Sequence, residues 1–123
     1  MKISEAESKV LEVFWRAAEP LSADEVVAAM DNDREWSAGT IRTFLTRLVK
    51  KEALSATPDG RRYLYRPLIQ REEYVHEQSR NLVDRLFGGR IAPFITQFSE
   101  RKNLSRDDVE ELKRLIARLE HDR

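Results

Sequence analysis

The segment from Ser37 to Gly60 constrains the fold of this chain more than any other, because a helical pattern is followed directly by a hairpin pattern. Ser37 is a favourable helix N-cap, and helical spacing of apolar residues continues to about Glu52. Apolar side chains share one side of this helix: Ile41, Phe44, Leu45 and Leu48. The other side carries only glycine, hydroxyl and cationic residues: Gly39, Arg42, Thr43, Thr46, Arg47 and Lys50. Such a helix can pack on a core with one face and enter the major groove of DNA with the other. An ordinary amphipathic helix with a solvated basic face would show the same pattern.

Two capped helices precede the basic helix. Ser4 with Glu7, and Ser22 with Glu25, have the spacing of a capping box. The first helix is expected to end near Ala18, and the second, shorter one near residue 30. This order predicts a helix-turn-helix in which the basic helix is the recognition helix.

A hairpin is predicted directly after the basic helix. Leu54 to Thr57 has a strand pattern, residues 58–60 (Pro-Asp-Gly) form a turn signal, and Arg62 to Pro67 is a second strand. A recognition helix followed by a hairpin makes a winged helix-turn-helix. Arg61 and Arg62 are then expected at the tip of the wing, beside a minor groove or a phosphate.

The remainder of the chain is predicted to be helical. A long helix covers about 71–87 and is ended by Gly88-Gly89, a shorter helix lies near 93–101, and the last helix begins at Ser105. Four apolar residues of the last helix recur with the spacing of a coiled-coil seam: Val109, Leu112, Ile116 and Leu119. The seam is too short to stand alone, so it closes either a core within the chain or a dimer interface.

We expect a dimer, because symmetric dimers read palindromic DNA. Residues expected at the interface are the four seam residues together with Leu82, Leu86 and Phe87. The fold class is therefore mostly α with a small β-hairpin. Residues 1–69 are expected to form the winged helix-turn-helix DNA-binding domain, and residues 70–123 a helical dimerisation domain.

Charge is unevenly distributed although the formal net charge is zero. Residues 36–71 carry 8 cations and 2 anions, whereas residues 1–35 carry 4 cations and 9 anions. A basic middle segment is typical of a surface that binds a polyanion such as DNA.

Other classes of function find no support in the residues. The chain has no cysteine, its two histidines (His76 and His121) are far apart in sequence, and no nucleophile–base constellation or phosphate-binding glycine loop is present. We therefore expect neither an enzyme, nor a cofactor, nor a metal site. The longest apolar run is Val26 to Met30, so a soluble cytoplasmic protein without direct membrane association is expected.

Several segments together resemble the BlaI/MecI penicillinase-repressor family. They are ISEAE and VFW, LSADEVV, WSAGTIRTFLTRLVKKEAL, GRRYLYRPL, EEYV, RLFGG and LSRDDVEELKRLI, which together reach from residue 3 to about residue 119. The resemblance implies a homodimeric transcriptional repressor that binds a palindromic double-stranded operator. It also implies silencing of β-lactamase or penicillin-binding-protein genes.

The same resemblance implies a release mechanism. Family members are cleaved in the dimerisation lobe after a membrane sensor metalloprotease is acylated by a β-lactam. The family's cleaved bond joins Asn to Phe, and the matching position here is Gln97–Phe98, where glutamine replaces asparagine. Gln97–Phe98 is therefore the predicted cleavage site.

DNA contacts are assigned by residue type. The residues expected in the groove are Thr40, Arg42, Thr43, Thr46 and Arg47. Arg42 and Thr43 are placed nearest the base edges, and Arg47 and Lys50 at phosphates. Lys51 and Arg61 are weaker phosphate candidates, and Arg62 serves the wing.

Three alternatives stay open at this point. One is a winged helix whose basic face binds an acidic protein. Another is a repressor of unrelated genes with a different release signal. The third is an activator or architectural DNA-binding protein, which differs only in where its site lies relative to a promoter.

Overall fold

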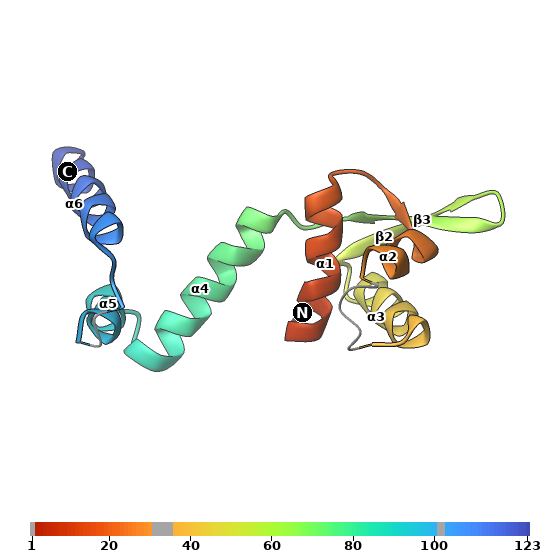
Figure 1. Ribbon diagram of the computed structural model, residues 1–123, viewed down its shortest axis with the longest axis horizontal. Helices are drawn as coiled ribbons and strands as arrows, with labels where there is room; N and C mark the ends of the chain where they lie inside the picture. Colours follow the sequence, from red (N-terminus) through yellow and green to blue (C-terminus); the bar gives the residue numbers. More distant parts are fainter. Residues whose placement is uncertain (1, 31–35, 101–102) are drawn as a thin grey trace. The chain divides into compact units, whose positions relative to one another are not determined.

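The computed structural model describes residues 2–30, 36–100 and 103–123. Its contacts divide the chain into two compact units, residues 1–76 and 77–123. Figure 1 shows the helices and strands of each unit. The fold is mostly helical, with a small antiparallel sheet, as predicted.

Unit 1 is a winged helix-turn-helix. Its helices and strands are α1 (Glu5–Ala17), β1 (Leu21–Ser22), α2 (Ala23–Ala29), α3 (Ala38–Lys50), β2 (Leu54–Asp59) and β3 (Arg62–Pro67). Both predicted capping boxes are present: Ser4 and Glu7 exchange hydrogen bonds of 2.8 and 3.1 Å, and Ser22 and Glu25 exchange bonds of 2.9 and 3.3 Å. Ser37 caps α3 by accepting a hydrogen bond from the backbone N–H of Thr40.

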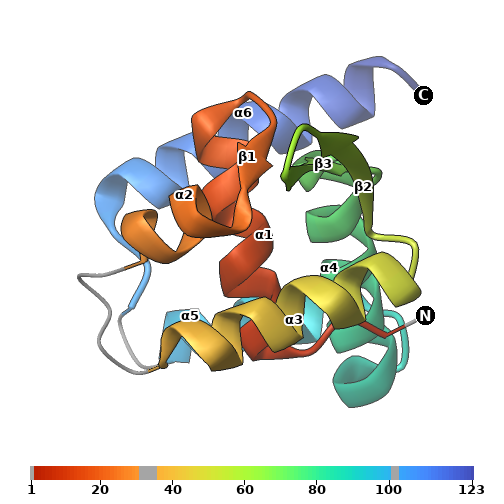
Figure 2. The same cartoon turned by 90° about the vertical axis from the view of Figure 1, so that its right-hand side faces the viewer.

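The three helices pack around one core. α1, α2 and α3 all contact one another, and α3 also contacts β2. Figure 2 looks onto α3, which crosses in front of α1. The buried core residues are Val10, Leu11, Phe14, Leu21, Val26, Met30, Ile41, Leu45, Leu48, Ala53 and Leu54. Every apolar residue assigned to the inner face of α3 is buried, except Phe44, which is half-buried.

The wing differs from its prediction in two ways. β2 and β3 pair from Leu54↔Pro67 to Asp59↔Arg62, so β2 is two residues longer than expected and the turn is Gly60-Arg61. Gly60 adopts the left-handed conformation that a two-residue hairpin turn requires (φ 66°). Pro58 remains in β2 because this strand lies at the edge of the sheet, where a missing N–H costs little.

The second difference is a third strand. Leu21 and Ser22 of β1 pair with Tyr65 and Leu64 of β3, which gives the sheet order β1-β3-β2. A strand of two residues is too short to show alternation in the sequence, and it was not predicted for that reason.

The start of α4 (Arg71–Phe87) is held on α1 within unit 1. The indole N–H of Trp15 donates a 3.0 Å hydrogen bond to the Ile69 carbonyl, and the Trp15 and Tyr74 rings lie 5.6 Å apart. Arg71 forms a 3.1 Å ion pair with Glu12. These contacts explain why the packing divides inside α4, after residue 76, whereas the sequence suggested a boundary at residue 69.

Unit 2 holds the rest of α4 with α5 (Ile91–Glu100) and α6 (Arg106–His121). Gly88 and Gly89 both have positive φ (59° and 82°) and end α4 as expected. α5 begins two residues before the predicted Pro93, and the predicted end at residue 101 lies outside the described residues. The rings of Phe87, Phe94 and Phe98 form successive edge contacts of 5.7 and 5.3 Å.

Unit 2 buries few apolar side chains. Val83 is its one buried apolar residue within the described ranges. The large apolar side chains that unit 2 leaves exposed are Leu86, Ile91, Phe98, Val109, Leu115, Ile116 and Leu119. No described helix in either unit combines the length and apolarity needed to cross a bilayer.

Candidate nucleic-acid interface

The buried inner face of α3 determines which of its side chains lie on the outer face. Because Ile41, Leu45 and Leu48 are buried in the core and Phe44 packs against it, the residues on the opposite side of α3 point to solvent. The predicted groove residues Arg42, Thr43, Thr46 and Arg47 are all exposed, as is Lys50, whereas Thr40 is half-buried in the first turn. The structure thus brings these side chains together on one helix face.

The threonines present methyl groups rather than hydroxyl hydrogens. Thr43 donates its hydroxyl hydrogen to the Gly39 carbonyl, and Thr46 donates to the Arg42 carbonyl, both at 3.1 Å. A hydroxyl committed in this way can accept a hydrogen bond but cannot donate one to a phosphate. Contact with a thymine methyl or a base amino group suits both residues better than contact with a phosphate.

Arg42 has a carboxylate partner. Its Nη2 donates to Oδ1 of Asp24, which lies in the first turn of α2. The sequence did not point to Asp24, because the two residues are 18 positions apart and meet only when α2 and α3 pack together.

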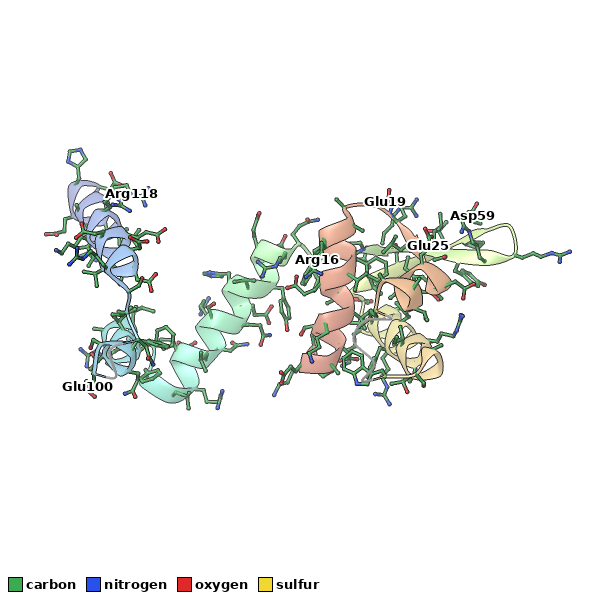
Figure 3. The ribbon with its side chains drawn as sticks, viewed as in Figure 1. Arg16, Glu19, Glu25, Asp59, Glu100 and Arg118 are labelled. Carbon is green, nitrogen blue, oxygen red and sulfur yellow. The ribbon has the colours of Figure 1, made fainter. Side chains whose placement is uncertain are left out.

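Arg62 is held by two carboxylates at the base of the hairpin turn. Its Nε donates to Oδ2 of Asp59 at 3.2 Å, and its Nη1 lies 3.8 Å from Oε1 of Glu25. Glu25 and Asp59 come from α2 and β2 and lie on the same side of unit 1 (Figure 3). Hydrogen bonds from Ser22, with a smaller contribution from the charge of Arg62, lower the pKa of Glu25 below its ordinary value.

Three cations of the predicted DNA surface are exposed and have no carboxylate partner among the described residues: Arg47, Lys50 and Arg61. Arg47 and Lys50 project from α3, and Arg61 occupies the hairpin turn. Unpaired cations attract phosphates most strongly, because no neighbouring anion offsets their charge.

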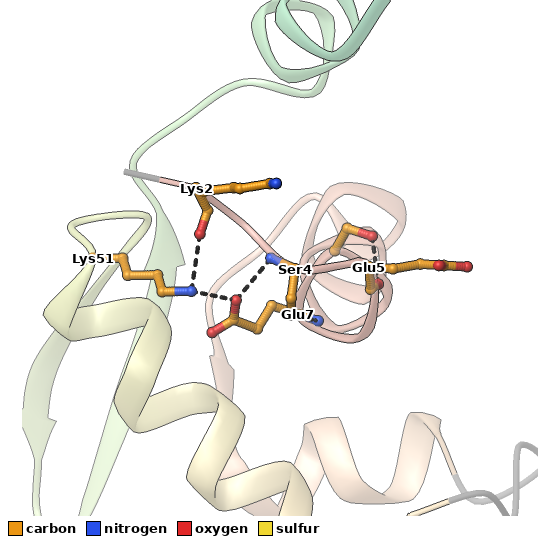
Figure 4. Close-up of polar contacts among 6 residues, drawn as sticks. Lys2, Ser4, Glu5, Glu7 and Lys51 are labelled. Atoms are coloured by element: carbon orange, nitrogen blue, oxygen red, sulfur yellow. Dashed lines mark hydrogen bonds and ion pairs between the residues drawn. The ribbon is translucent and has the colours of Figure 1, made fainter. Parts of the chain in front are cut away.

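Lys51, predicted as a weaker phosphate contact, lies in a different environment from Arg47 and Lys50. Its Nζ donates to Oε1 of Glu7 at 2.5 Å and to the Lys2 carbonyl at 2.9 Å (Figure 4). Glu7 is only 1% exposed. Burial by itself raises the pKa of Glu7, but hydrogen bonds from Lys51 and Ser4 outweigh burial and leave that pKa below its ordinary value. The sequence revealed Glu7 only as a capping residue, because Lys51 is 44 positions away.

Unit 1 also contains an open hollow of about 400 Å³. It is lined by Phe14, Trp15, Ala18, Glu19, Pro20, Arg66, Pro67 and Gln70. Its charged residues are Glu19 and Arg66, and its lining includes no serine, histidine or other side chain able to act as a nucleophile–base pair. Within the described residues, no cluster of His, Asp and Glu could hold a metal ion.

The residues predicted for unit 2 lie on α4, α5 and α6. Leu86, Val109, Ile116 and Leu119 are exposed, and Leu82, Phe87 and Leu112 are half-buried. Gln97 and Phe98 are exposed in the second half of α5.

Comparison with known proteins gives the family. The penicillinase repressor family model matches residues 3–118. A penicillinase repressor of Bacillus licheniformis is 31% identical over 94% of this chain and 89% of its own length. The methicillin resistance regulatory protein MecI of Mammaliicoccus sciuri is 30% identical over 94% of this chain and 93% of its own.

One solved structure of a relative contains DNA. The monomeric form of Bacillus licheniformis BlaI, in complex with the blaP half-operator, is 36% identical to this chain, with a TM-score of 0.52. The match covers 60% of this chain and 89% of that one. These similarities agree with the exposed basic face of α3. The chain therefore belongs to the penicillinase repressor family of BlaI/MecI-type DNA-binding repressors, which are transcriptional regulators and not enzymes.

Proposed function

We propose that this protein represses transcription by binding a palindromic operator as a homodimer, with α3 of each protomer in a major groove and the wing beside the backbone. The observation that carries this proposal is the outer face of α3, where Arg42, Arg47 and Lys50 are exposed and no carboxylate belongs to the same face. The complex of BlaI with a half-operator supports it, because 89% of that DNA-bound relative is covered by the match to this chain.

Roles within the interface follow from the surroundings of each side chain. Arg42 and Thr43 lie nearest the base edges, with Thr40 and Thr46 beside them in the groove. Arg47, Lys50 and Arg61 take phosphates because their charges have no anionic partner among the described residues. Arg62, held by the carboxylates of Glu25 and Asp59, supports the wing.

The exposed apolar side chains of unit 2 support a homodimer. Exposed apolar side chains lie along α6, and large ones also occur on α4 and α5. An exposed apolar surface of this kind is a common mark of a protein–protein interface. A second copy of the same chain is the partner that a palindromic operator requires. Linking two half-site readers raises the affinity of each for its half-site through effective concentration.

Release from DNA is assigned to cleavage between Gln97 and Phe98 by a membrane sensor metalloprotease that responds to β-lactam or cell-wall stress. Both side chains are exposed on α5 of the single chain. Since the bond lies inside a helix, α5 must unwind locally before cleavage. Incubation with the cognate activated sensor, followed by mass mapping of the fragments, tests the site. Fragments whose ends map to another bond, or an uncut chain, would exclude Gln97–Phe98 as the cleavage site.

The repressor function itself is tested by fluorescence anisotropy. Binding is measured as a function of salt to the DNA directly upstream of the gene for this protein and to a shuffled duplex of the same composition. We expect tight binding to the upstream DNA with two chains per duplex, weakening steeply with salt, and much weaker binding to the shuffled control. No binding to either duplex at low salt would instead favour an acidic protein as the partner of the basic face.

A further inference from the structure

The first turn of α2 holds two arginines of the proposed DNA surface. Asp24 binds Arg42 of α3, and its neighbour Glu25 lies 3.8 Å from Arg62 of β3. Two adjacent carboxylates on one short helix therefore contact the recognition helix and the wing. The pair of Asp24 and Arg42 is the closer of the two. It includes Arg42, which is one of the two residues placed nearest the bases.

Stability does not explain the pair of Asp24 and Arg42. The side chain of Asp24 is 86% exposed and that of Arg42 is 52% exposed. Ion pairs this exposed contribute little to folding and are screened by salt. Asp24 also suits the first turn of a helix because of the helix dipole, but that preference does not require an arginine partner from another helix. The pairing thus points to a role at the surface where α3 meets DNA.

The geometry leaves Arg42 free to bind a base while it remains on Asp24. The carboxylate of Asp24 accepts a hydrogen bond from Nη2 alone. A guanidinium carries five N–H donors on three nitrogens. The remaining donors are sufficient for the paired contacts that arginine makes with guanine N7 and O6. Meanwhile the carboxylate charge offsets that of the guanidinium, which reduces the attraction of Arg42 for phosphates in general.

We propose that Asp24 is a specificity-determining positioning residue: it holds the guanidinium of Arg42 in one orientation and offsets its charge, so that Arg42 strengthens binding only where a base accepts its remaining donors. This inference rests on the proposed function. It separates two groups of cations. Arg47, Lys50 and Arg61 supply attraction to any DNA, while Arg42 supplies discrimination between sequences, which depends on a difference of two affinities.

The test compares four proteins and one control: wild type, Asp24→Asn, Arg42→Ala, the double variant, and Glu5→Gln. Glu5 is an exposed carboxylate in the first turn of α1, and its replacement removes the same charge. Each protein is titrated by anisotropy at several salt concentrations against two duplexes. One is the duplex that wild type enriches most from a random-sequence pool, and the other is its shuffled version.

We expect Asp24→Asn to bind the shuffled duplex roughly three- to eightfold more tightly at 0.1 M salt, because one further cation becomes available to phosphates. Its affinity for the enriched duplex does not rise in proportion. The ratio of the affinity for the enriched duplex to that for the shuffled duplex therefore falls at least about threefold. In the Arg42→Ala background the same change leaves the ratio unaltered. Glu5→Gln keeps the ratio of wild type.

Three results would overturn this inference alone: an unchanged ratio in Asp24→Asn, an equal fall in the Arg42→Ala background, or an equal fall in Glu5→Gln. A wild-type protein that enriches no sequence and binds both duplexes equally would overturn the proposed function, and this inference with it. The two failures are therefore distinguishable in one data set.

Discussion

Arg42 and Lys50 project from the same face of α3, but their surroundings differ. Arg42 is held by a carboxylate, and Lys50 has none among the described residues. We predict that Arg42→Ala weakens binding to the preferred duplex by about 1–3 kcal/mol and relaxes the sequence preference. Anisotropy with the preferred duplex and with single-base variants of it measures both effects. An equal loss on preferred and shuffled DNA would contradict base contact by Arg42.

Lys50 should behave differently. We predict that Lys50→Ala weakens binding to all DNA by a similar factor and lowers the slope of log affinity against log salt by about 1, because one phosphate contact is lost. A salt titration on preferred and shuffled duplexes measures this slope. Lys113→Ala is a suitable control, since Lys113 is exposed on α6 in the other unit. A loss confined to the preferred duplex would argue against a phosphate role.

Glu7 is the residue whose titration should affect stability most directly. Its pKa in the folded protein lies below its ordinary value of 4.5. Its ionised form therefore stabilises the fold at pH values above that ordinary value, and the stabilisation is lost as the pH falls through the folded pKa. We predict that Glu7→Gln lowers the free energy of unfolding by about 1–3 kcal/mol at pH 7, because Lys51 loses its charged partner.

The deficit of Glu7→Gln should shrink as the pH falls below 4.5, because wild type then loses the same interaction. Urea unfolding at pH 7 and at acid pH measures the difference between the two proteins. Glu5→Gln, at an exposed position, should show no deficit at either pH. A deficit for Glu7→Gln that stays constant with pH would mean that the charge of Glu7 contributes nothing.

Among the elements, the C-terminus of α1 carries a conformational cost. Ala18 caps this helix in the left-handed conformation (φ 58°), which glycine adopts more readily. We predict that Ala18→Gly stabilises unit 1 by about 0.5–1 kcal/mol, which thermal unfolding detects as a higher Tm. Ala17→Gly, one residue earlier and still helical, should destabilise by a similar amount. Destabilisation by both changes would show that the conformation of Ala18 carries no cost.

Elements with a strong local signal were predicted well from the sequence. α3 was recognised through its N-cap and its apolar spacing, and its outer face follows from the same spacing. β1 was missed because two residues carry no periodicity, and the turn of the wing was displaced because proline usually ends a strand but is tolerated at a sheet edge. The partners of Arg42 and Lys51 could not be predicted, because each pair forms only when distant segments pack together.

At the scale of the whole molecule, the two units differ in how they bury apolar surface. Unit 1 has a core built from α1, α2, α3 and the sheet, whereas α5 and α6 have no buried residue. A helical unit without its own core is stabilised by packing against another surface. The proposed dimer supplies that surface for unit 2 and leaves the fold of unit 1 independent of it.

This difference predicts separable effects. Ile116→Glu combined with Leu119→Glu should convert the proposed dimer to a monomer, because charges would be buried in its apolar interface. The monomer should bind a single half-site as wild type does but lose the gain on a full palindrome, which is commonly 10²-fold or more for linked sites. Sedimentation and anisotropy measure the two properties. Arg114→Glu, exposed on the same helix, should remain dimeric.

The pair of Lys51 and Glu7 also has a chemical consequence for the neighbouring lysine. Lys50 and Lys51 are adjacent in the chain, but only Lys50 exposes its amino group, since the Nζ of Lys51 is bonded to two oxygens. An acylating enzyme or reagent should therefore distinguish between these neighbours and modify Lys50. Acylation there would remove a charge from the face proposed to meet phosphates without disturbing the core. Of two consecutive lysines, one is thus open to reversible control of DNA affinity, and the other is protected by the fold.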